Sequence, residues 1–484
     1  MKNRFRIPVL LILCTVILFA VGCSKATETS TTDANDKQTD TTTEVATEET
    51  TEEGGKNYTF RIGCSNEAWR AENIIAAAKM LNEQLASEGS KDTVTVEYEV
   101  VDDFVNTFNL WIKEDNLPEF IAQTRSIVAD FSKAGAIVDS SYVVNDEVYS
   151  TKVSQKMRDM GFMNDSYYGI ILDTEVRFVI IYKPALQQLG WTDEQIEAWK
   201  TDARAGKITA KDLQDLAKQV VDAGICEYGI THRPNKGADW PYTFITWNDG
   251  EVPVNDQGQV VINRQNIIDF LSYWRENVQL GITPYNHLTD FNWDMLEGDI
   301  WPNGKAFCWY GQIAAKGDVM AASGVTSEYF DENYFSIPNP VPQAGDPVTG
   351  GSNPYFYALT TASQKDEKTA EYCRRILDNV LDTELQLNTS VRHAHLAITQ
   401  ETIDHPEYQK DAWMLDATYM NDYSYTTPHN SYLQMFMSSQ EFFDAIQQAE
   451  VEANDPNAAS IETITDELIN KITFNMGEGN YVLE

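Results

Sequence analysis

From residue 57 onward, two kinds of hydrophobic pattern take turns along the chain. Apolar and polar residues alternate in some segments, which is typical of β-strands, and apolar residues return every three or four positions in others, which is typical of amphipathic helices. Strands are predicted at residues 58–64, 93–101, 120–122 and 176–182, and helices at 72–85, 104–112, 210–223, 267–280, 369–381 and 460–472. Because strands and helices alternate, the pattern predicts an α/β architecture.

Local signals refine this prediction at three places. Thr209 precedes the helix at 210–223 and is expected to be its N-cap, because a threonine hydroxyl can accept a hydrogen bond from the first turn. Residues 255–258 read Asn-Asp-Gln-Gly between apolar residues, which predicts a hairpin over 252–262. Residues 336–355 are rich in Pro and Gly and are expected to form a passage between domains.

The start of the chain is typical of an export signal. Lys2, Arg4 and Arg6 precede an apolar run at residues 7–21, and this run is shorter than the roughly 20 residues of a comfortable membrane span. Residues 18–23 resemble a bacterial lipobox, although Ala20 stands where Leu is more usual. The resemblance implies cleavage before Cys23 and a diacylglyceryl group on its sulfur, which would anchor the chain stably to a membrane. The alternative is an ordinary secretory signal, with Cys23 incidental.

The segment after Cys23 is predicted to be a solvated tether. Residues 27–51 contain eleven threonines, many acidic residues and only Val45 as a sizeable aliphatic side chain. Such a segment cannot bury enough apolar surface to offset the entropy of ordering it. About 430 residues follow, which is long for one hydrophobic core and favours two domains.

Charge and cysteine content exclude several function classes. The formal net charge is −38, which argues against nucleic-acid binding and against adhesion to anionic lipid. Cys64, Cys226, Cys308 and Cys373 are widely spaced, with no Cys-x-x-Cys pair, so no zinc or redox site is predicted. Free buried thiols are favoured over disulfides, because each cysteine lies among apolar residues.

Several motifs, taken in order, resemble one large family. They lie at residues 60–63, 115–121, 168–170, 180–191, 280–284, 304–311, 350–359 and 386–397. In this order the chain is similar to the extracellular solute-binding proteins of ABC importers, the family that includes the maltose-binding protein. The resemblance implies two α/β lobes of the periplasmic-binding-protein type with a ligand cleft, and three crossings near residues 172–174, 337–339 and 391–396.

The resemblance also implies a division of the chain and a mode of action. The expected parts are a signal (1–22), a tether (23–56), the first lobe (57–172 and 339–394) and the second lobe (173–338 and 395–484, with C-terminal helices). Hinge closure around a ligand is a recognised motion of this class. The closed form would then deliver its cargo to the membrane permease of an ABC importer. We expect a monomer on the outer face of the cell membrane, and the lipobox with its acidic tether favours a Gram-positive surface.

Aromatic content favours a carbohydrate, and we expect an oligosaccharide. The chain has 11 Trp, 23 Tyr and 20 Phe, and aromatic rings can stack on sugar rings while polar side chains bind hydroxyls. Ligand contacts are predicted mainly where loops follow predicted strands, at Trp69, Arg70, Arg125, Asp173, Asp239, Trp240, Trp309, Tyr310, Gln312 and Tyr355. In the family, the positions matching the Trp240 loop and the 309–312 loop commonly carry such contacts. For each aromatic residue the alternative is a place in the core.

Other functions remain open at this stage. The same body could present ligand to a membrane sensor kinase, or carry a peptide or a polyamine. An exported glycosidase would need two carboxylates at a defined separation, and with 74 acidic residues candidate pairs carry no information. No nucleophile, zinc-protease or phosphate-loop motif is present, so no enzyme activity, cofactor or metal is predicted. His393 and His395 alternate as strand residues would, and that pair alone lacks the ligands of a metal site.

Overall fold

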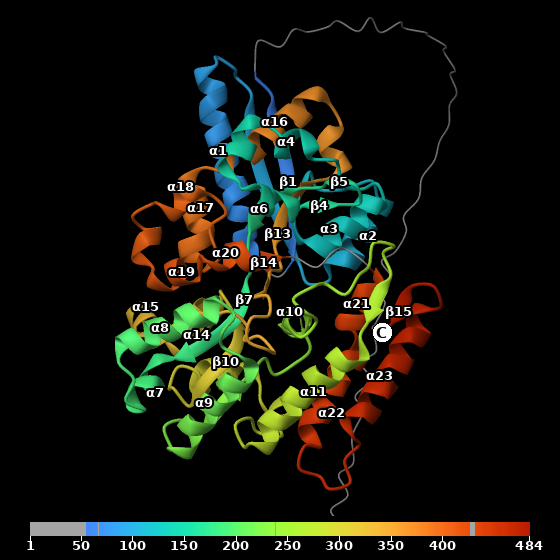
Figure 1. The fold of residues 1–484 in the computed structure, drawn as a ribbon. Helices are drawn as coiled ribbons and strands as arrows, with labels where there is room; N and C mark the ends of the chain where they lie inside the picture. Colours follow the sequence, from blue (N-terminus) through green and yellow to red (C-terminus); the bar gives the residue numbers. More distant parts are fainter. Residues whose placement is uncertain (1–54, 66, 238, 426–430) are drawn as a thin grey trace, which may run out of the picture. The chain divides into compact units, whose positions relative to one another are not determined.

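The computed structural model describes residues 55–484 except 66, 238 and 426–430 (Figure 1). The predicted signal, Cys23 and almost all of the predicted tether lie outside these residues. The α/β prediction is confirmed, with two lobes that each form around one sheet.

The first lobe contains a five-stranded sheet in the order β2-β1-β3-β13-β6. β1 pairs in parallel with β2 and with β3, and β13 runs antiparallel to β3 and β6. The strands are β1 (Asn57–Ser65), β2 (Thr93–Val101), β3 (Phe120–Thr124), β6 (Ile170–Asp173) and β13 (Tyr355–Leu359). The lobe's longer helices are α1 (Glu72–Ser87), α2 (Phe104–Lys113), α3 (Arg125–Lys133) and α16 (Glu367–Asn379), and its shorter elements are α4 (Ser141–Val144), α5 (Glu147–Lys152), α6 (Gln155–Asp159), β4 (Phe162–Met163) and β5 (Ser166–Tyr167).

The hydrophobic spacing explains why β1 and α1 pack together. Phe60, Ile62 and Cys64 alternate along β1 and are fully buried. The buried residues of α1 recur every three or four positions, among them Ile74 and Leu81. Both sets belong to the same core cluster, so one face of each element closes the interior of the first lobe.

The second lobe contains a four-stranded sheet in the order β11-β7-β10-β8. Its strands are β7 (Arg177–Tyr182), β8 (Tyr228–Thr231), β10 (Ala306–Gln312) and β11 (Tyr334–Ile337). Its helices include α7 (Lys183–Gln188), α8 (Asp193–Arg204), α9 (Ala210–Asp222), α10 (Asp239–Thr246), α11 (Arg264–Gln279), α14 (Ala315–Ser323), α15 (Ser327–Asn333), α21 (Ser431–Met437), α22 (Gln440–Val451) and α23 (Ile461–Met476). Helices α11, α22 and α23 pack against one another (Figure 1). Both faces of this sheet are covered, because Trp309 of β10 lies in one core cluster while its neighbours Cys308 and Tyr310, which point to the opposite face, lie in another.

The lobes are not continuous in sequence. The chain leaves the first sheet after Asp173 and enters the second at Arg177, and it returns between Ile337 and Tyr355. Short helices follow α16, namely α17 (Thr383–Leu387), α18 (Gln400–Ile403), α19 (Ala412–Ala417) and α20 (Met420–Tyr423). Trp413 of α19 packs in the same cluster as Phe178 of β7, so the chain's last third also covers the second sheet. The residue limits of the lobes expected from the sequence stay predictions.

Local predictions fare differently. Thr209 caps α9 as expected, and its hydroxyl accepts the amide hydrogen bond of Asp212. The hairpin over 252–262 is confirmed in a short form: Val254 and Val260 form an antiparallel bridge, and Val261 N donates to the Pro253 carbonyl oxygen at 3.0 Å. In addition, β9 (Val260–Ile262) pairs in parallel with β15 (Tyr481–Leu483). The predicted alternation at 393–395 is wrong, because a short π-helix, η4 (Asn388–Arg392), ends there and His393 follows it in a turn.

The cysteines and the apolar character of the helices can be compared with the sequence for the described residues. Cys64, Cys226, Cys308 and Cys373 are free and buried, as predicted. Within residues 55–484, apart from the gaps named above, no helix combines the length and apolar character of a membrane span.

Candidate functional site

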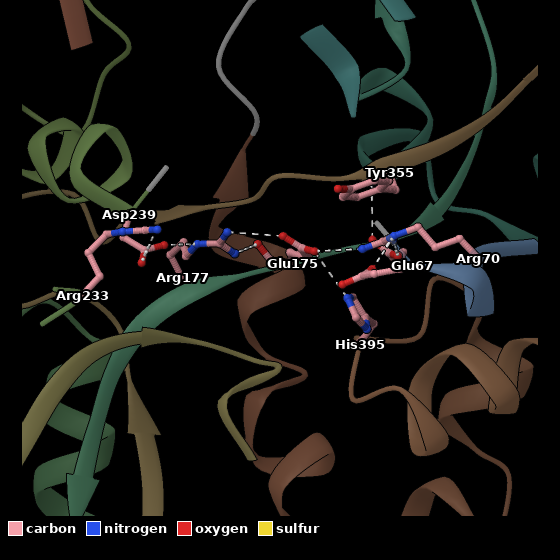
Figure 2. Close-up of polar contacts among 9 residues, drawn as sticks. Glu67, Arg70, Glu175, Arg177, Arg233, Asp239, Tyr355 and His395 are labelled. Carbon is pink, nitrogen blue, oxygen red and sulfur yellow. Dashed lines mark hydrogen bonds and ion pairs between the residues drawn. The ribbon is translucent and has the colours of Figure 1, made fainter. Parts of the chain in front are cut away.

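Charged side chains from both lobes meet where the chain passes from β6 to β7 (Figure 2). Asp173 ends β6, Arg177 begins β7, and Glu175 lies between the two strands. The carboxyl-terminal ends of strands in an α/β sheet are the usual place for a ligand site. The ion pairs around Glu175 therefore occupy a position where function is expected.

Arg70 is the centre of this network on the first lobe. It lies in the short helix η1 (Ala68–Ala71), directly after β1, and its side chain is 1% exposed. Its Nη1 lies 2.8 Å from Asp173 Oδ2, its Nη2 3.2 Å from Glu175 Oε1, and its Nε 2.8 Å from Glu67 Oε2. Burial lowers the pKa of Arg70, but Asp173 and the other neighbours outweigh burial and raise the pKa above its ordinary value.

Arg177 is the matching centre on the second lobe. Its Nη2 lies 3.3 Å from Glu175 Oε2, and its Nε lies 2.5 Å from Asp239 Oδ1 at the start of α10. The other oxygen of Asp239 accepts a hydrogen bond from Arg233 Nη1 at 3.0 Å. The network thus runs from Arg233 to Arg70 in an unbroken series of opposite charges (Figure 2).

His395 adds a further positive group from a third segment. Its Nδ1 lies 2.6 Å from the carbonyl oxygen of His393. Because a carbonyl only accepts, Nδ1 must carry a proton. Its Nε2 lies 3.5 Å from Glu175 Oε1. Burial lowers the pKa of His395, but Asp173 and Glu175 outweigh it and raise the pKa above its ordinary value, which favours the imidazolium form.

The pKa values of the two acidic side chains at the crossing, Asp173 and Glu175, shift in opposite directions. Burial raises the pKa of Asp173 above its ordinary value, against the effect of His395 and Arg70. Burial also acts to raise the pKa of Glu175, but His395 and Arg177 outweigh it and lower the pKa. Of these two carboxyl groups, Glu175 is therefore the one that loses its proton more readily.

Trp69 supplies an aromatic face beside the network. Its ring stacks on the His393 imidazole, with 4.3 Å between the centroids and 12° between the planes. Its Nε1 donates a hydrogen bond to Glu67 Oε2 at 3.1 Å. Trp69 remains partly exposed. Its accessible ring therefore binds the same carboxylate, that of Glu67, which also pairs with Arg70.

The second lobe contributes more acidic groups. Gln312, the last residue of β10, hydrogen-bonds Asp318 on α14, and burial raises the pKa of Asp318 above its ordinary value. Burial, Asp318 and Asp294 together raise the pKa of Glu297 to about 7. Glu297 lies in the π-helix η2 (Leu296–Ile300), which packs against α14. Burial is the main cause of both raised pKa values, and the neighbouring carboxyl groups of Asp318 and Asp294 add to it at Glu297.

Four of the residues predicted to bind ligand are brought together in the network. These are Arg70, Asp173, Asp239 and Tyr355, whose ring centroid lies 3.3 Å from the Arg70 guanidinium carbon. Trp69 lies beside them.

Trp309 and Tyr310 were expected in a loop, and that placement is wrong, because both lie within β10. Trp309 is fully buried and stacks on Trp301, with 4.7 Å between the centroids. Tyr310 points to the opposite face, where its hydroxyl lies 2.8 Å from that of Tyr273. Since β10 is covered on both faces, successive aromatic side chains of this strand become core residues.

Trp240 and Arg125 were also predicted to bind ligand, and both make contacts with other residues of the protein. Trp240 is 3% exposed, its Nε1 donates to the Asn235 carbonyl, and its ring contacts Trp274. It borders a cavity of about 170 Å³ between the 236–240 segment and the start of α22. Arg125 donates to the carbonyls of Met160 and Phe162, and burial lowers its pKa to about 10.

Sequence reasoning missed five members of the network, namely Glu67, Glu175, Arg177, Arg233 and His395. One signal was available for two of them. Glu175 and Arg177 flank Val176 at the start of a strongly apolar strand, where an unpaired charge would be costly to bury.

Comparison with solved structures identifies the same fold in sugar-binding proteins. A sugar transporter of Arthrobacter chlorophenolicus A6 with bound laminaribiose superposes with a TM-score of 0.63 at 13% identity, over 87% of this chain and 100% of that chain. The cyclic alpha-maltosyl-1,6-maltose binding protein of Arthrobacter globiformis gives 0.64 at 13% identity, over 87% and 100%. An ABC substrate-binding protein of Listeria monocytogenes in complex with cycloalternan gives 0.61 at 12% identity, over 87% and 99%.

These likenesses show the fold, which is the two-lobe fold of periplasmic binding proteins. No protein-family model matches the chain, and no curated protein matches its sequence.

Proposed function

We propose that this chain is an extracellular solute-binding protein that captures an uncharged carbohydrate between its lobes and delivers it to an ABC importer. The observation that carries the proposal is the two-lobe fold with a partly exposed tryptophan, Trp69, beside the lobe crossing. Solved proteins of this fold hold laminaribiose and cycloalternan. An aromatic ring next to hydrogen-bonding groups is a common arrangement for binding sugars.

The charge balance supports an uncharged ligand. The guanidiniums of Arg70, Arg177 and Arg233 each contact at least one carboxylate within 3.3 Å. A negatively charged sugar would have to displace one of these carboxylates and would also meet the acidic groups around Glu297. Since burying an unpaired charge is costly, an anionic ligand is disfavoured at this place.

Membrane attachment completes the proposal. Lipidation of Cys23, followed by the acidic, threonine-rich tether, would hold the two lobes near the outer face of the cell membrane. Closure around the sugar would shift the balance of lobe arrangements by the difference in its affinity for the two states. The permease would then receive the closed form.

Thermal unfolding against a panel of neutral mono- and oligosaccharides tests the proposal, with uronic-acid oligosaccharides, peptides and polyamines measured beside them. A ligand at about 100 times its dissociation constant stabilises a protein by roughly 2.7 kcal/mol, which shifts the melting temperature by a few degrees. A shift with a neutral glycan that is recovered unchanged supports sugar binding. A shift with peptides or polyamines alone contradicts it, and cleavage of the glycan would identify an enzyme instead.

Two tryptophan variants sharpen this test. Trp69→Ala should remove the glycan-induced shift, because the exposed ring is proposed to contact the sugar. Trp191→Ala is the matched control, since Trp191 is also partly exposed but packs against Trp199 in the second lobe. If both variants keep the full shift, Trp69 is not the sugar platform.

A further inference from the structure

Glu175 lies in the crossing segment, outside both sheets, and its carboxylate contacts both lobes. Oε1 lies 3.2 Å from Arg70 Nη2 in the first lobe, and Oε2 lies 3.3 Å from Arg177 Nη2 in the second. The Glu175 side chain is 14% exposed, against 1% for Arg70 and 6% for Arg177. One carboxylate therefore neutralises two buried cations that belong to different lobes.

All three connecting segments converge on this residue. The carbonyl oxygen of Glu175 accepts a hydrogen bond from Asn353 N at 3.2 Å, in the segment that returns to the first lobe. On either side of it, Thr174 bridges Leu396 and Val176 bridges Ser352. His395, beside Leu396, places its Nε2 3.5 Å from Glu175 Oε1. The two lobes therefore cannot change their relative position without a movement of the residues around Glu175.

The geometry of the contact limits the arrangements it can satisfy. Arg177 is fixed to the second lobe by Asp239, and Arg70 is fixed to the first by Asp173. A carboxylate spans about 2 Å between its oxygens, so Glu175 can hold both guanidiniums only when they approach from opposite sides. Rotation of one lobe would separate Arg70 or Arg177 from Glu175, and the loss of one partner from a buried ion-pair network is unfavourable even though Asp173 and Asp239 stay in contact.

We propose that Glu175 is a latch that holds the two lobes in the arrangement described here. It acts on the balance between lobe arrangements and touches no ligand. Hinges of two-lobe proteins consist of a few residues at the ends of elements, and Glu175 occupies such a position between β6 and β7. The preferred arrangement of the two lobes is then determined by the protein's own charged side chains, without any ligand.

Hydrogen exchange of the full purified chain without ligand tests the latch. Glu175→Gln keeps the size of the side chain and removes its charge. We expect amides at residues 172–178 and 350–356 to exchange at least about ten-fold faster, because loss of one partner from a buried ion pair favours local opening. Small-angle X-ray scattering of the same sample should show a changed radius of gyration, because the balance between lobe arrangements shifts.

Glu401→Gln is the matched control. Glu401 also pairs with a distant lysine, with 3.0 Å between Lys152 Nζ and its Oε2, but this pair is exposed. The control should change neither the exchange at the crossing nor the radius of gyration, because exposed pairs contribute little.

A second variant covers the case in which Glu175→Gln does not fold. Arg177→Lys keeps the positive charge but cannot bind Asp239 and Glu175 together through a planar fork, and it should also speed exchange at both crossing segments. The proposal is overturned if a folded Glu175→Gln, or Arg177→Lys in its place, exchanges within about two-fold of the parent chain at these segments.

Discussion

The Arg70 guanidinium carbon lies 3.3 Å from the centroid of the Tyr355 ring, although the two residues are 285 positions apart in a sequence that visits the other lobe between them. The contact joins a helix at the end of β1 to the first residue of β13. It completes the enclosure of a cation that Asp173 also neutralises. Aromatic faces attract guanidinium groups, so the Tyr355 ring adds to the stabilisation of the Arg70 charge.

Loss of the Asp173 charge should destabilise the protein strongly. Asp173→Asn leaves Arg70 with a weaker partner in a fully buried place. We expect the free energy of unfolding to fall by about 3 kcal/mol, the lower end for breaking a buried ion pair. Urea unfolding measures it. Asp193→Asn removes an exposed pair with Lys183 and should lower the free energy of unfolding far less, because exposed pairs contribute little. Equal losses in the two variants would contradict the central role of the buried pair.

His395 should make stability depend on pH. Its pKa is raised in the folded protein from an ordinary value of 6.5, so its stabilising contribution is complete below pH 6.5 and is lost as the pH rises through the folded-state pKa. Melting temperatures of the parent chain and of His395→Gln should therefore differ most at pH 6 and converge at higher pH. His405→Gln, at a partly exposed histidine, is the control. A gap between parent and His395→Gln that widens with rising pH would contradict the assignment.

Trp309 should be needed for folding stability. Trp309→Ala empties a fully buried position stacked on Trp301, and we expect a loss of about 3–5 kcal/mol in the free energy of unfolding. Guanidinium unfolding measures this loss. Trp69→Ala, at a partly exposed ring, should cost clearly less. A small loss at Trp309 would show that this side chain is not the core residue that its burial indicates.

Cys23 should decide where the chain is found. With Cys23→Ser the lipid cannot be attached, and we expect the exported protein to leave the membrane fraction for the medium or the soluble fraction. Cell fractionation followed by immunoblotting measures the distribution. Cys14→Ser is the matched control, since it changes a cysteine in the apolar run of the predicted signal. Unchanged membrane association of Cys23→Ser would contradict lipidation at this residue.

Local patterns predicted most of the elements. The strand at 93–101 has the bounds of β2, and the helix at 210–223 is α9 with its expected cap. These predictions hold because burial on one face imposes a period that the sequence displays. The turn signal at 255–258 likewise predicted the antiparallel bridge between Val254 and Val260. The parallel pairing of β9 with the C-terminal strand β15 was not predicted, because a local pattern carries no information on partners that lie far apart in the sequence.

The site was predictable only in part. Arg70 was expected near the ligand because it follows the first strand, Asp173 because it lies near the first crossing, and Tyr355 because it follows the Gly350-Gly351 turn. The structure brings these three residues together. Glu175 and Arg177 were missed, since their role depends on partners brought close by the folded chain. Trp309 was expected to contact the ligand because it was placed in a loop after the Gly304-Lys305 strand, and only the packing on both faces of β10 shows that it is a core residue.

Calorimetric titration of the purified chain with a neutral oligosaccharide, chosen by its shift in thermal unfolding, tests the central claim most directly. We expect saturable binding near one sugar per chain, at least about ten-fold weaker binding by Trp69→Ala as an aromatic contact is lost, and no binding of a uronic-acid oligosaccharide of the same length. Binding of the anionic oligosaccharide in preference to the neutral one, or of peptides or polyamines with no sugar bound at all, would contradict it.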